Sequence, residues 1–218
     1  MSLAAAITVF AGFAPTYFLK SAFGRPALSP LLHVHGLLFT SWIVLFVIQT
    51  SLVAVKRTYI HRRLGIIGGI LAIGMLFAGF LAAIDAARRG ATTPGGPPAL
   101  QFLAIPLFDL PVFAILVGTG LYFRRQTAVH KRLLLLATIH LLPAAIARLP
   151  HVGAAGPLAF FGLTDLLIVV CWIYDRVVRG RIHPAFLWGG LFVILSQPLR
   201  LLVSGTDAWM AFATWLTR

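Results

Sequence analysis

An uncharged apolar run constrains this chain more than any other feature of its sequence. No Asp, Glu, Lys or Arg occurs between Arg25 and Lys56. About 20 apolar residues are enough to cross the roughly 30 Å of hydrocarbon in a bilayer. Backbone groups find no water there, so a segment that crosses must be helical. The sequence therefore predicts a transmembrane helix over 31–55, with His33 and His35 near one membrane face and a basic cluster after residue 55.

Composition agrees with a membrane protein that crosses the bilayer several times. Of the 218 residues 60% are hydrophobic and 11% are charged, whereas a soluble domain carries about 25% charged residues. The net charge of +13 lies in short loops between apolar segments, which favours topology signals and lipid headgroup contacts over nucleic acid. Cys171 is the single cysteine, so disulfide frameworks and thiolate metal clusters are excluded.

We predict seven spans in one integral membrane bundle covering residues 1–218. The N-terminal segment lacks the positive region of a cleaved signal peptide and is expected to remain as the first span. The spans are 3–19, 31–55, 64–84, 101–123, 132–149, 157–178 and 185–203. The fold class is thus all-α and polytopic, with seven transmembrane helices.

The Lys and Arg residues predict the orientation of the bundle. Eleven lie in or beside the loops after spans 2, 4 and 6, against seven on the opposite side. Cytoplasmic loops are richer in Lys and Arg, so we expect a bacterial inner-membrane protein with a cytoplasmic N-terminus and a periplasmic C-terminus. The tail 206–216 has two Trp residues, which suit an interfacial helix.

Spans 3, 5 and 7 each begin with a histidine in a basic context. The segments are YIHRRLG (59–65), AVHKRLL (128–134) and RIHPAFL (181–187). They are explained equally well by three related hairpins preceded by one added helix or by the attraction of basic residues to any cytoplasmic helix start.

Ionisable residues gather in the other half of the membrane, where each is a functional-site hypothesis by default. Of the five acidic residues only Asp175 lies on the cytoplasmic side, and glutamate is absent. The residues of this outer half are His33, His35, Asp85, Asp109, Arg148, His151 and Asp165.

His140 is the most informative position. It follows Lys131 by nine residues, which places it about 13 Å into the membrane. A buried histidine needs a hydrogen-bond partner, a metal or a cofactor. A carbonyl freed by Pro143, or a Ser or Thr on a facing helix, would satisfy it without any ligand.

Three functions fit these residues, and the first is haem binding for electron transfer. His35 and His140 would be axial ligands of a b-type haem, and Arg148 would hold a propionate. His35 is preferred to His33 because it is deeper and precedes Gly36. A second haem would use His61 with His130, or either with His183, near the cytoplasmic face. Each of these three could equally be an interfacial histidine beside basic residues. A quinone or a redox protein would be the partner.

The second function is metal-dependent hydrolysis of a lipid amide or ester at the outer face. Zinc or another transition metal would be held by histidines and aspartates and would activate a water. The candidate ligands are His33, His35, His140, His151, Asp85, Asp109 and Asp165. The alternative for the aspartates is pairing with Arg88, Arg89, Arg148 or Arg200, or capping of helix N-termini.

The third function is that of a transporter or an accessory membrane subunit, in which the polar groups line a path or join helices. A P-loop, a dinucleotide fingerprint and a serine nucleophile elbow are absent as convincing motifs.

The stretch from His35 to Gly65 carries a family resemblance. Its pattern of H-x-H-G, then Trp, then Gln, a basic loop and HRRLG resembles bacterial multi-span membrane proteins of the DUF2306 type. HKRLLLLATIHLL (130–142) is a second landmark of that resemblance. The transmembrane histidines also resemble those of haem-binding, cytochrome b-like bundles. The span count and the His and Asp content resemble metal hydrolases related to alkaline ceramidase, although the paired histidines near the end of those chains are missing here.

Overall fold

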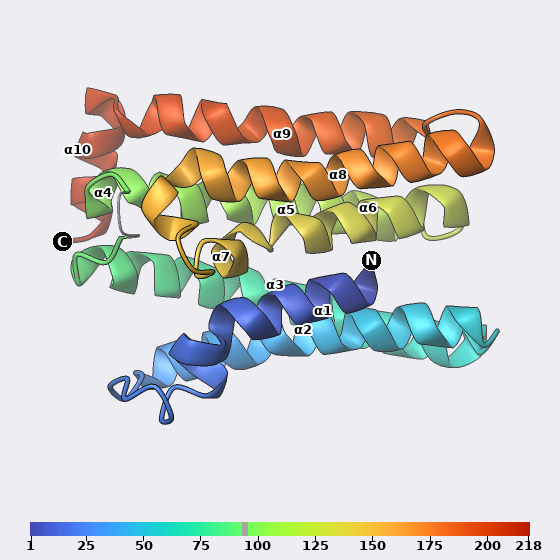
Figure 1. Ribbon diagram of the computed structural model, residues 1–218, viewed down its shortest axis with the longest axis horizontal. Coiled ribbons are helices and arrows are strands. Elements are labelled where there is room, and N and C mark those ends of the chain that lie inside the picture. Colours follow the sequence, from blue (N-terminus) through green and yellow to red (C-terminus); the bar gives the residue numbers. More distant parts are fainter. Residues whose placement is uncertain (93–95) are drawn as a thin grey trace.

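Every regular element of the computed structural model is a helix (Figure 1), over the residues it describes, 1–92 and 96–218. The α-helices are α1 (Ser2–Phe13), α2 (Pro30–Ala54), α3 (Thr58–Arg88), α4 (Ala99–Phe102), α5 (Ala104–Tyr122), α6 (Thr127–His140), α7 (Pro143–Ile146), α8 (Pro157–Arg179), α9 (Pro184–Ser204) and α10 (Asp207–Leu216). A π-helical turn, η1 (Ala14–Phe18), extends α1, and a 3₁₀ turn, η2 (Gly153–Ala155), precedes α8.

Six helical segments of the described chain are long and apolar enough to cross a membrane. They are Pro30–Ala54, Thr58–Arg88, Ala99–Tyr122, Thr127–Ile146, Pro157–Arg179 and Pro184–Ser204. Ser2–Phe18 is a shorter apolar helix. The prediction of an all-helical, polytopic membrane protein is confirmed, while the seventh crossing and the three related hairpins remain predictions.

Proline and glycine explain where several helices begin and end. Pro30, Pro157 and Pro184 stand in the first turns of α2, α8 and α9, where a missing N–H costs nothing. The Ser29 hydroxyl accepts a hydrogen bond from the Leu32 amide at 3.3 Å and caps α2. Gly180 ends α8 in the left-handed conformation, with φ of 72°, which glycine adopts without steric cost.

Two predicted spans are interrupted. The fourth, predicted at 101–123, consists of α4 and α5 with a break at Leu103. The fifth, predicted at 132–149, is helical from Thr127 to His140 and resumes only for the single turn of α7. Pro143 lacks an amide hydrogen to continue the helix of α6, so the helix ends directly after His140.

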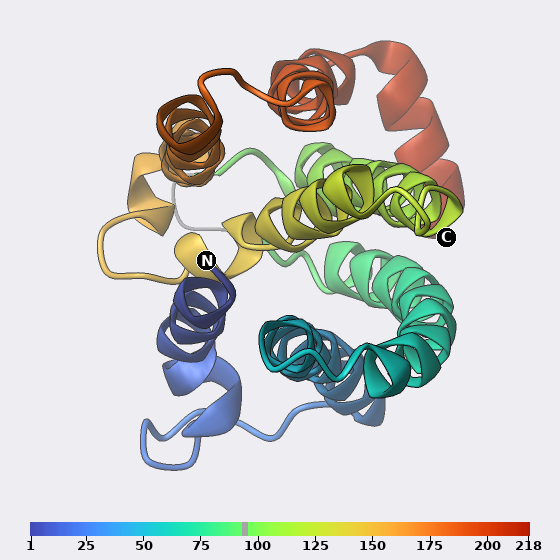
Figure 2. The ribbon, with the colours of Figure 1, turned by 90° about the vertical axis from the view of Figure 1, so that its right-hand side faces the viewer.

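The long helices run along one axis, and α6 lies in the middle of them (Figures 1 and 2). Leu136, Ala137 and Ile139 of α6 are buried. Trp42 of α2 donates its indole N–H to the Thr138 hydroxyl at 3.2 Å within this core. The loops after α2, α5 and α8 lie together at one end of the bundle, which we call the basic end. The C-terminal end of α3 and helix α10 lie at the opposite end (Figure 1).

The C-terminal tail forms a helix, as predicted. The Thr206 hydroxyl caps α10 by accepting a hydrogen bond from the Trp209 amide at 3.2 Å. The Trp209 indole donates to the Leu100 carbonyl at 2.9 Å, and Trp209 packs in one cluster with Ala83 and Ala104. The helix therefore closes the opposite end of the bundle, and its place at a membrane interface remains a prediction.

Candidate functional site

His140 is the last residue of α6. Its hydrogen-bond partner comes from another helix. Its side chain is 2% exposed. Its Nε2 lies 3.2 Å from the Asp109 carbonyl oxygen and 3.3 Å from the Asp109 Oδ1, both on α5. Both atoms are acceptors, so Nε2 carries the hydrogen in the neutral ring. The histidine is thus satisfied by protein groups, and no metal or cofactor is needed to explain its burial.

Arg200 of α9 completes this cluster, which we call the Asp109 network (Asp109, His140, Ser196 and Arg200). Its guanidinium is fully buried and donates to the Asp109 carboxylate. Its Nε donates to the Ser196 carbonyl at 3.1 Å, and a second nitrogen donates to the Ser196 hydroxyl at 2.8 Å. A charge in hydrocarbon requires such partners, and the network supplies them from three helices.

The other aspartates of this half also have partners. Asp165 accepts a hydrogen bond from Gln197 at 2.8 Å. Asp85 pairs with Arg89, one turn along α3, at 2.8 Å. The alternative in which these aspartates pair with arginines therefore describes Asp85 and Asp109. Over residues 1–92 and 96–218, no three side chains of His, Cys, Asp or Glu gather as a metal ion requires.

His33, His35, Arg148 and His151 lie toward the opposite end without forming one cluster. The His35 ring stacks on Phe39 of its own helix, with 4.2 Å between ring centres. Arg148 lies over the Phe13 ring at 4.4 Å and donates to a main-chain carbonyl. His33 and His151 are exposed. The ring pairs of the described residues do not include His35 with His140, so that haem site remains a prediction.

His61 and His130 are brought together at the basic end. His61 lies in the first turns of α3 and His130 in the first turns of α6. Their ring centres are 6.2 Å apart and the ring planes are nearly perpendicular, at 80°. The Nδ1 of His130 lies 2.8 Å from the Gly120 carbonyl oxygen. Since a carbonyl only accepts, Nδ1 carries the hydrogen and Nε2 is left with a free lone pair.

The His61 ring has an unused nitrogen. Its Nδ1 is buried and has no hydrogen-bond partner among the described residues. The ring also forms a hydrogen bond with the Gln49 backbone of α2, and the Gln49 Oε1 is buried without a partner in that part of the chain. Buried polar atoms are rarely left unpaired, so the contact between His61 and Gln49 is only partly satisfied.

His183, the third histidine predicted at this end, has a capping role. Its Nδ1 accepts a hydrogen bond from the Ala185 amide at 3.1 Å at the start of α9, and its own amide donates to Asp175 at 3.2 Å. Burial lowers the pKa of His183, and the positive charge of Arg132 lowers it further. His183 is thus held as a neutral acceptor, away from the pair of His61 and His130.

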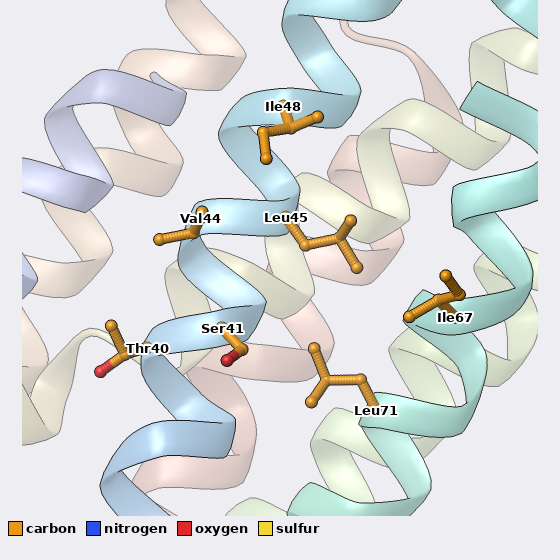
Figure 3. A pocket seen from close by; sticks show the side chains of 7 residues that line it. All are labelled: Thr40, Ser41, Val44, Leu45, Ile48, Ile67 and Leu71. Carbon is orange, nitrogen blue, oxygen red and sulfur yellow. The ribbon is translucent and has the colours of Figure 1, made fainter. Parts of the chain in front are cut away.

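A shallow groove of about 300 Å³ lies between α2 and α3 (Figure 3). Its lining is aliphatic apart from two hydroxyl groups and consists of Thr40, Ser41, Val44, Leu45, Ile48, Ile67 and Leu71. Val44, Ile48 and Ile67 are exposed, so the groove opens toward the surroundings of the bundle. It suits an apolar chain rather than a charged substrate.

Sequence reasoning named the residues of the pair His61 and His130 but missed most of what surrounds Asp109. Nothing in the sequence singles out Ser196, and Arg200 is there only one of four possible partners for the aspartates. One signal does identify Arg200, because it is the single charged residue within 185–203. Gln49 stands out in the sequence only as part of the pattern from His35 to Gly65.

Searches against protein-family models, curated proteins and solved structures found no match to this chain. The resemblance to DUF2306-type proteins accordingly remains a prediction from the residues that carry it.

Proposed function

We propose that the chain is a membrane haem b protein that transfers electrons, with His61 and His130 as the residues that would hold the haem iron. The distance of 6.2 Å between their ring centres carries this proposal. Two imidazoles that would hold one metal ion, each through a nitrogen at about 2.0 Å, have ring centres roughly 5 to 6 Å apart.

The surroundings of the two rings support their holding the haem iron. A ligating histidine usually donates its second ring N–H to a carbonyl or carboxylate, which fixes the ring and leaves the other nitrogen for the metal. The Gly120 carbonyl fills that role for His130. The buried Nδ1 of His61 is available for an equivalent hydrogen bond. Arg57 and Arg62, close to His61 in the sequence, are the natural partners for the haem propionates.

The proposal differs from the haem site that the sequence favours first. His140 already donates Nε2–H to Asp109, which leaves the pair of His35 and His140 with weaker support than His61 and His130. Imidazole ligation from both sides suits electron transfer rather than oxygen chemistry. An electron-transferring haem needs a donor and an acceptor, and a membrane quinone or a redox protein would serve.

We further propose seven crossings of a bacterial inner membrane. Ser2–Phe18 is the first, short crossing; at 1.5 Å per residue its 17 residues span about 25 Å. The basic end then faces the cytoplasm, because eleven of the eighteen Lys and Arg residues lie at that side. The N-terminus is cytoplasmic, the C-terminus is periplasmic, and the proposed haem lies near the cytoplasmic face.

The test is the absorption spectrum of the purified protein. We expect a Soret band that shifts on reduction with dithionite and is lost in His61→Ala and in His130→Ala. His33→Ala, a change at an exposed histidine, is the matched control and should keep the band. Loss of the band in His140→Ala, but not in His130→Ala, would contradict the assignment and favour the pair of His35 and His140.

The same preparation tests the alternative of zinc-dependent lipid hydrolysis. A colourless protein with one zinc per chain, lost in Asp109→Ala, would support that hydrolase. A colourless protein without metal would leave the role of transporter or accessory subunit.

A further inference from the structure

We propose that one anionic phospholipid binds along α8 at the basic end, with an acyl chain in a groove beside Trp172 and its phosphate on Arg176. This inference goes beyond the proposed function and does not depend on haem. It is carried by a groove of about 290 Å³ that Trp172 and Arg176 both line, and by the balance of charge around Arg176.

The groove, which we call the α8 groove, follows one face of α8. Five of its lining residues recur at spacings of three and four, which places them on one side of a helix. Val169 is ten residues before the end of α8, or about 15 Å along the axis. One leaflet holds about 15 Å of hydrocarbon, half of the roughly 30 Å of the bilayer. The groove therefore runs from the bilayer interior to the basic end. Its lining is Val169, Trp172, Ile173, Arg176 and Val177 of α8 and Ile182 of the following loop.

Trp172 gives this groove a fixed wall. Its indole N–H donates to the Phe186 carbonyl of α9 at 2.7 Å. Its ring packs against Gly190 of α9, where an added Cβ would lie 2.7 Å from the nearest ring atom. Ile173 and Val177 are 56% and 77% exposed, so a chain can enter sideways from the bilayer. An acyl chain would bury apolar surface there without needing a polar partner.

Arg176 places a positive charge at the outer end of the groove. Its guanidinium donates to the Gly180 carbonyl, one turn nearer the basic end. Within residues 1–92 and 96–218 this carbonyl is its one hydrogen-bond acceptor, whereas a guanidinium has five N–H groups. The side chain is exposed, so its other N–H groups can reach a phosphate that lies outside the groove. Guanidinium forks bind phosphate oxygens in pairs.

The acidic side chain nearest to Arg176 in the sequence already has other partners. Asp175 is the one acidic residue of the chain on this side. It is 1% exposed and pairs with Arg132 at 2.5 Å, and Arg179 lies 3.6 Å from the same carboxylate. An anion for Arg176 therefore has to come from outside the chain. Lys and Arg residues close to a membrane surface attract anionic lipids.

An anionic phospholipid matches both parts of this site. A free phosphate would use Arg176 but not the apolar groove, and a neutral phospholipid brings a cation close to Arg176 together with its phosphate. The groove between α2 and α3 offers a comparison within the same molecule. It has nearly the same volume, about 300 Å³, but no charged residue lines it, so we expect it to accept acyl chains without selecting a headgroup.

Binding is measured by native mass spectrometry of the purified full chain in a neutral detergent. The probes are dioleoylphosphatidylglycerol, dioleoylphosphatidylcholine and inorganic phosphate. The tightest site should prefer phosphatidylglycerol at least about fivefold, and Arg176→Gln should abolish that preference. Arg176→Lys keeps the charge and should retain part of it. Arg125→Gln makes the same change at another exposed arginine of the basic end and should bind as the wild type does.

A second pair of variants tests the acyl chain. Val169→Phe fills the α8 groove and should weaken binding of phosphatidylglycerol at its tightest site. Val44→Phe makes the same change in the groove between α2 and α3 and should leave the preference for phosphatidylglycerol intact. Both valines are accessible on the surface of the bundle, so neither change disturbs its core.

The outcomes do not involve the Soret band, so they separate this inference from the proposed function. Equal affinity of the wild type for the two lipids, or wild-type selectivity in Arg176→Gln, overturns the lipid site. Binding of inorganic phosphate in place of lipid would assign Arg176 to a soluble anion and also overturn it. A dimer that is lost in Val169→Phe, without bound lipid, would assign the groove to a second copy of the chain and overturn it as well.

Discussion

Arg132 of α6 and Asp175 of α8 form an ion pair of 2.5 Å at the basic end, with only 2% and 1% of their side chains exposed. Two hydrogen bonds join them, since Arg132 Nε also donates to Asp175 at 2.9 Å. Asp175 additionally accepts from the His183 amide. The Asp175 carboxylate therefore joins α6, α8 and the start of α9.

Removing one member of this pair should be costly. Asp175→Leu leaves the Arg132 guanidinium buried without its partner, and such changes typically destabilise by about 3–5 kcal/mol. Thermal unfolding of the purified protein in detergent measures the loss. The double variant Arg132→Met/Asp175→Leu should recover most of it, because no unpaired charge remains. Asp85→Asn, at a pair that is largely exposed, is the control and should change stability little.

The Asp109 network should respond in the same way at the other end of the bundle. Arg200→Leu removes the cation that pairs with Asp109 and leaves the carboxylate with His140 alone. We expect a loss of about 3–5 kcal/mol in denaturant unfolding. Arg200→Lys keeps the charge but cannot reproduce the forked contacts to Asp109 and Ser196, so its loss should be partial. An Arg200→Leu protein as stable as the wild type would show that the network contributes nothing to folding.

The pH dependence of stability should depend on His183. Because burial lowers the pKa of His183 in the folded chain, the unfolded chain binds a proton more readily below its ordinary pKa of about 6.5. Stability is therefore complete above that pH and falls as the pH falls through it. The loss should reach about 1 kcal/mol, the usual contribution of an N-cap. Melting temperatures between pH 8 and pH 5 measure it.

The control for that experiment keeps the cap and removes the titration. His183→Ser retains an oxygen that can accept from the Ala185 amide, so the melting temperature should vary less with pH than in the wild type. An unchanged pH profile in this variant would assign the effect to other groups.

Two glycine substitutions should have opposite effects. A Cβ on Gly12 would lie 2.2 Å from the Ala145 carbonyl oxygen, which forces α1 away from α7. We expect Gly12→Ala to destabilise by about 1–3 kcal/mol. Gly162 has open space around its Cβ position, so Gly162→Ala should stabilise α8 by up to about 1 kcal/mol. The melting temperatures of the two variants measure these effects. We expect a lower melting temperature than the wild type for Gly12→Ala and a higher one for Gly162→Ala.

The helices could be predicted from the sequence because a backbone segment in hydrocarbon must satisfy its own hydrogen bonds, and a helix does so. The predicted 31–55, 157–178 and 185–203 each lie within a residue or two of the observed bounds. The sequence predicts that the third span begins at 64, whereas α3 begins at Thr58. Basic residues such as Arg62 and Arg63 mark the end of the hydrocarbon, but they do not stop a helix. Their positions therefore do not predict where α3 begins.

The contacts between helices could not be predicted in this way. Asp109 and Arg200 are 91 residues apart, and nothing in the apolar pattern states that α5 and α9 face each other at those turns. The sequence leaves open whether His140 pairs with protein or with a ligand, because its neighbours in sequence are apolar. Its partner comes from another helix, and the rotation and height of that helix are fixed by packing that a linear pattern does not record.

The close contact of Gly12 with Ala145 has a consequence for biogenesis. Helix α1 packs against a turn that is synthesised more than 120 residues later. Until α7 is made, the glycine face of α1 lacks this packing partner. The docking of α1 in the bundle is therefore completed late in synthesis, after the helices between them already exist.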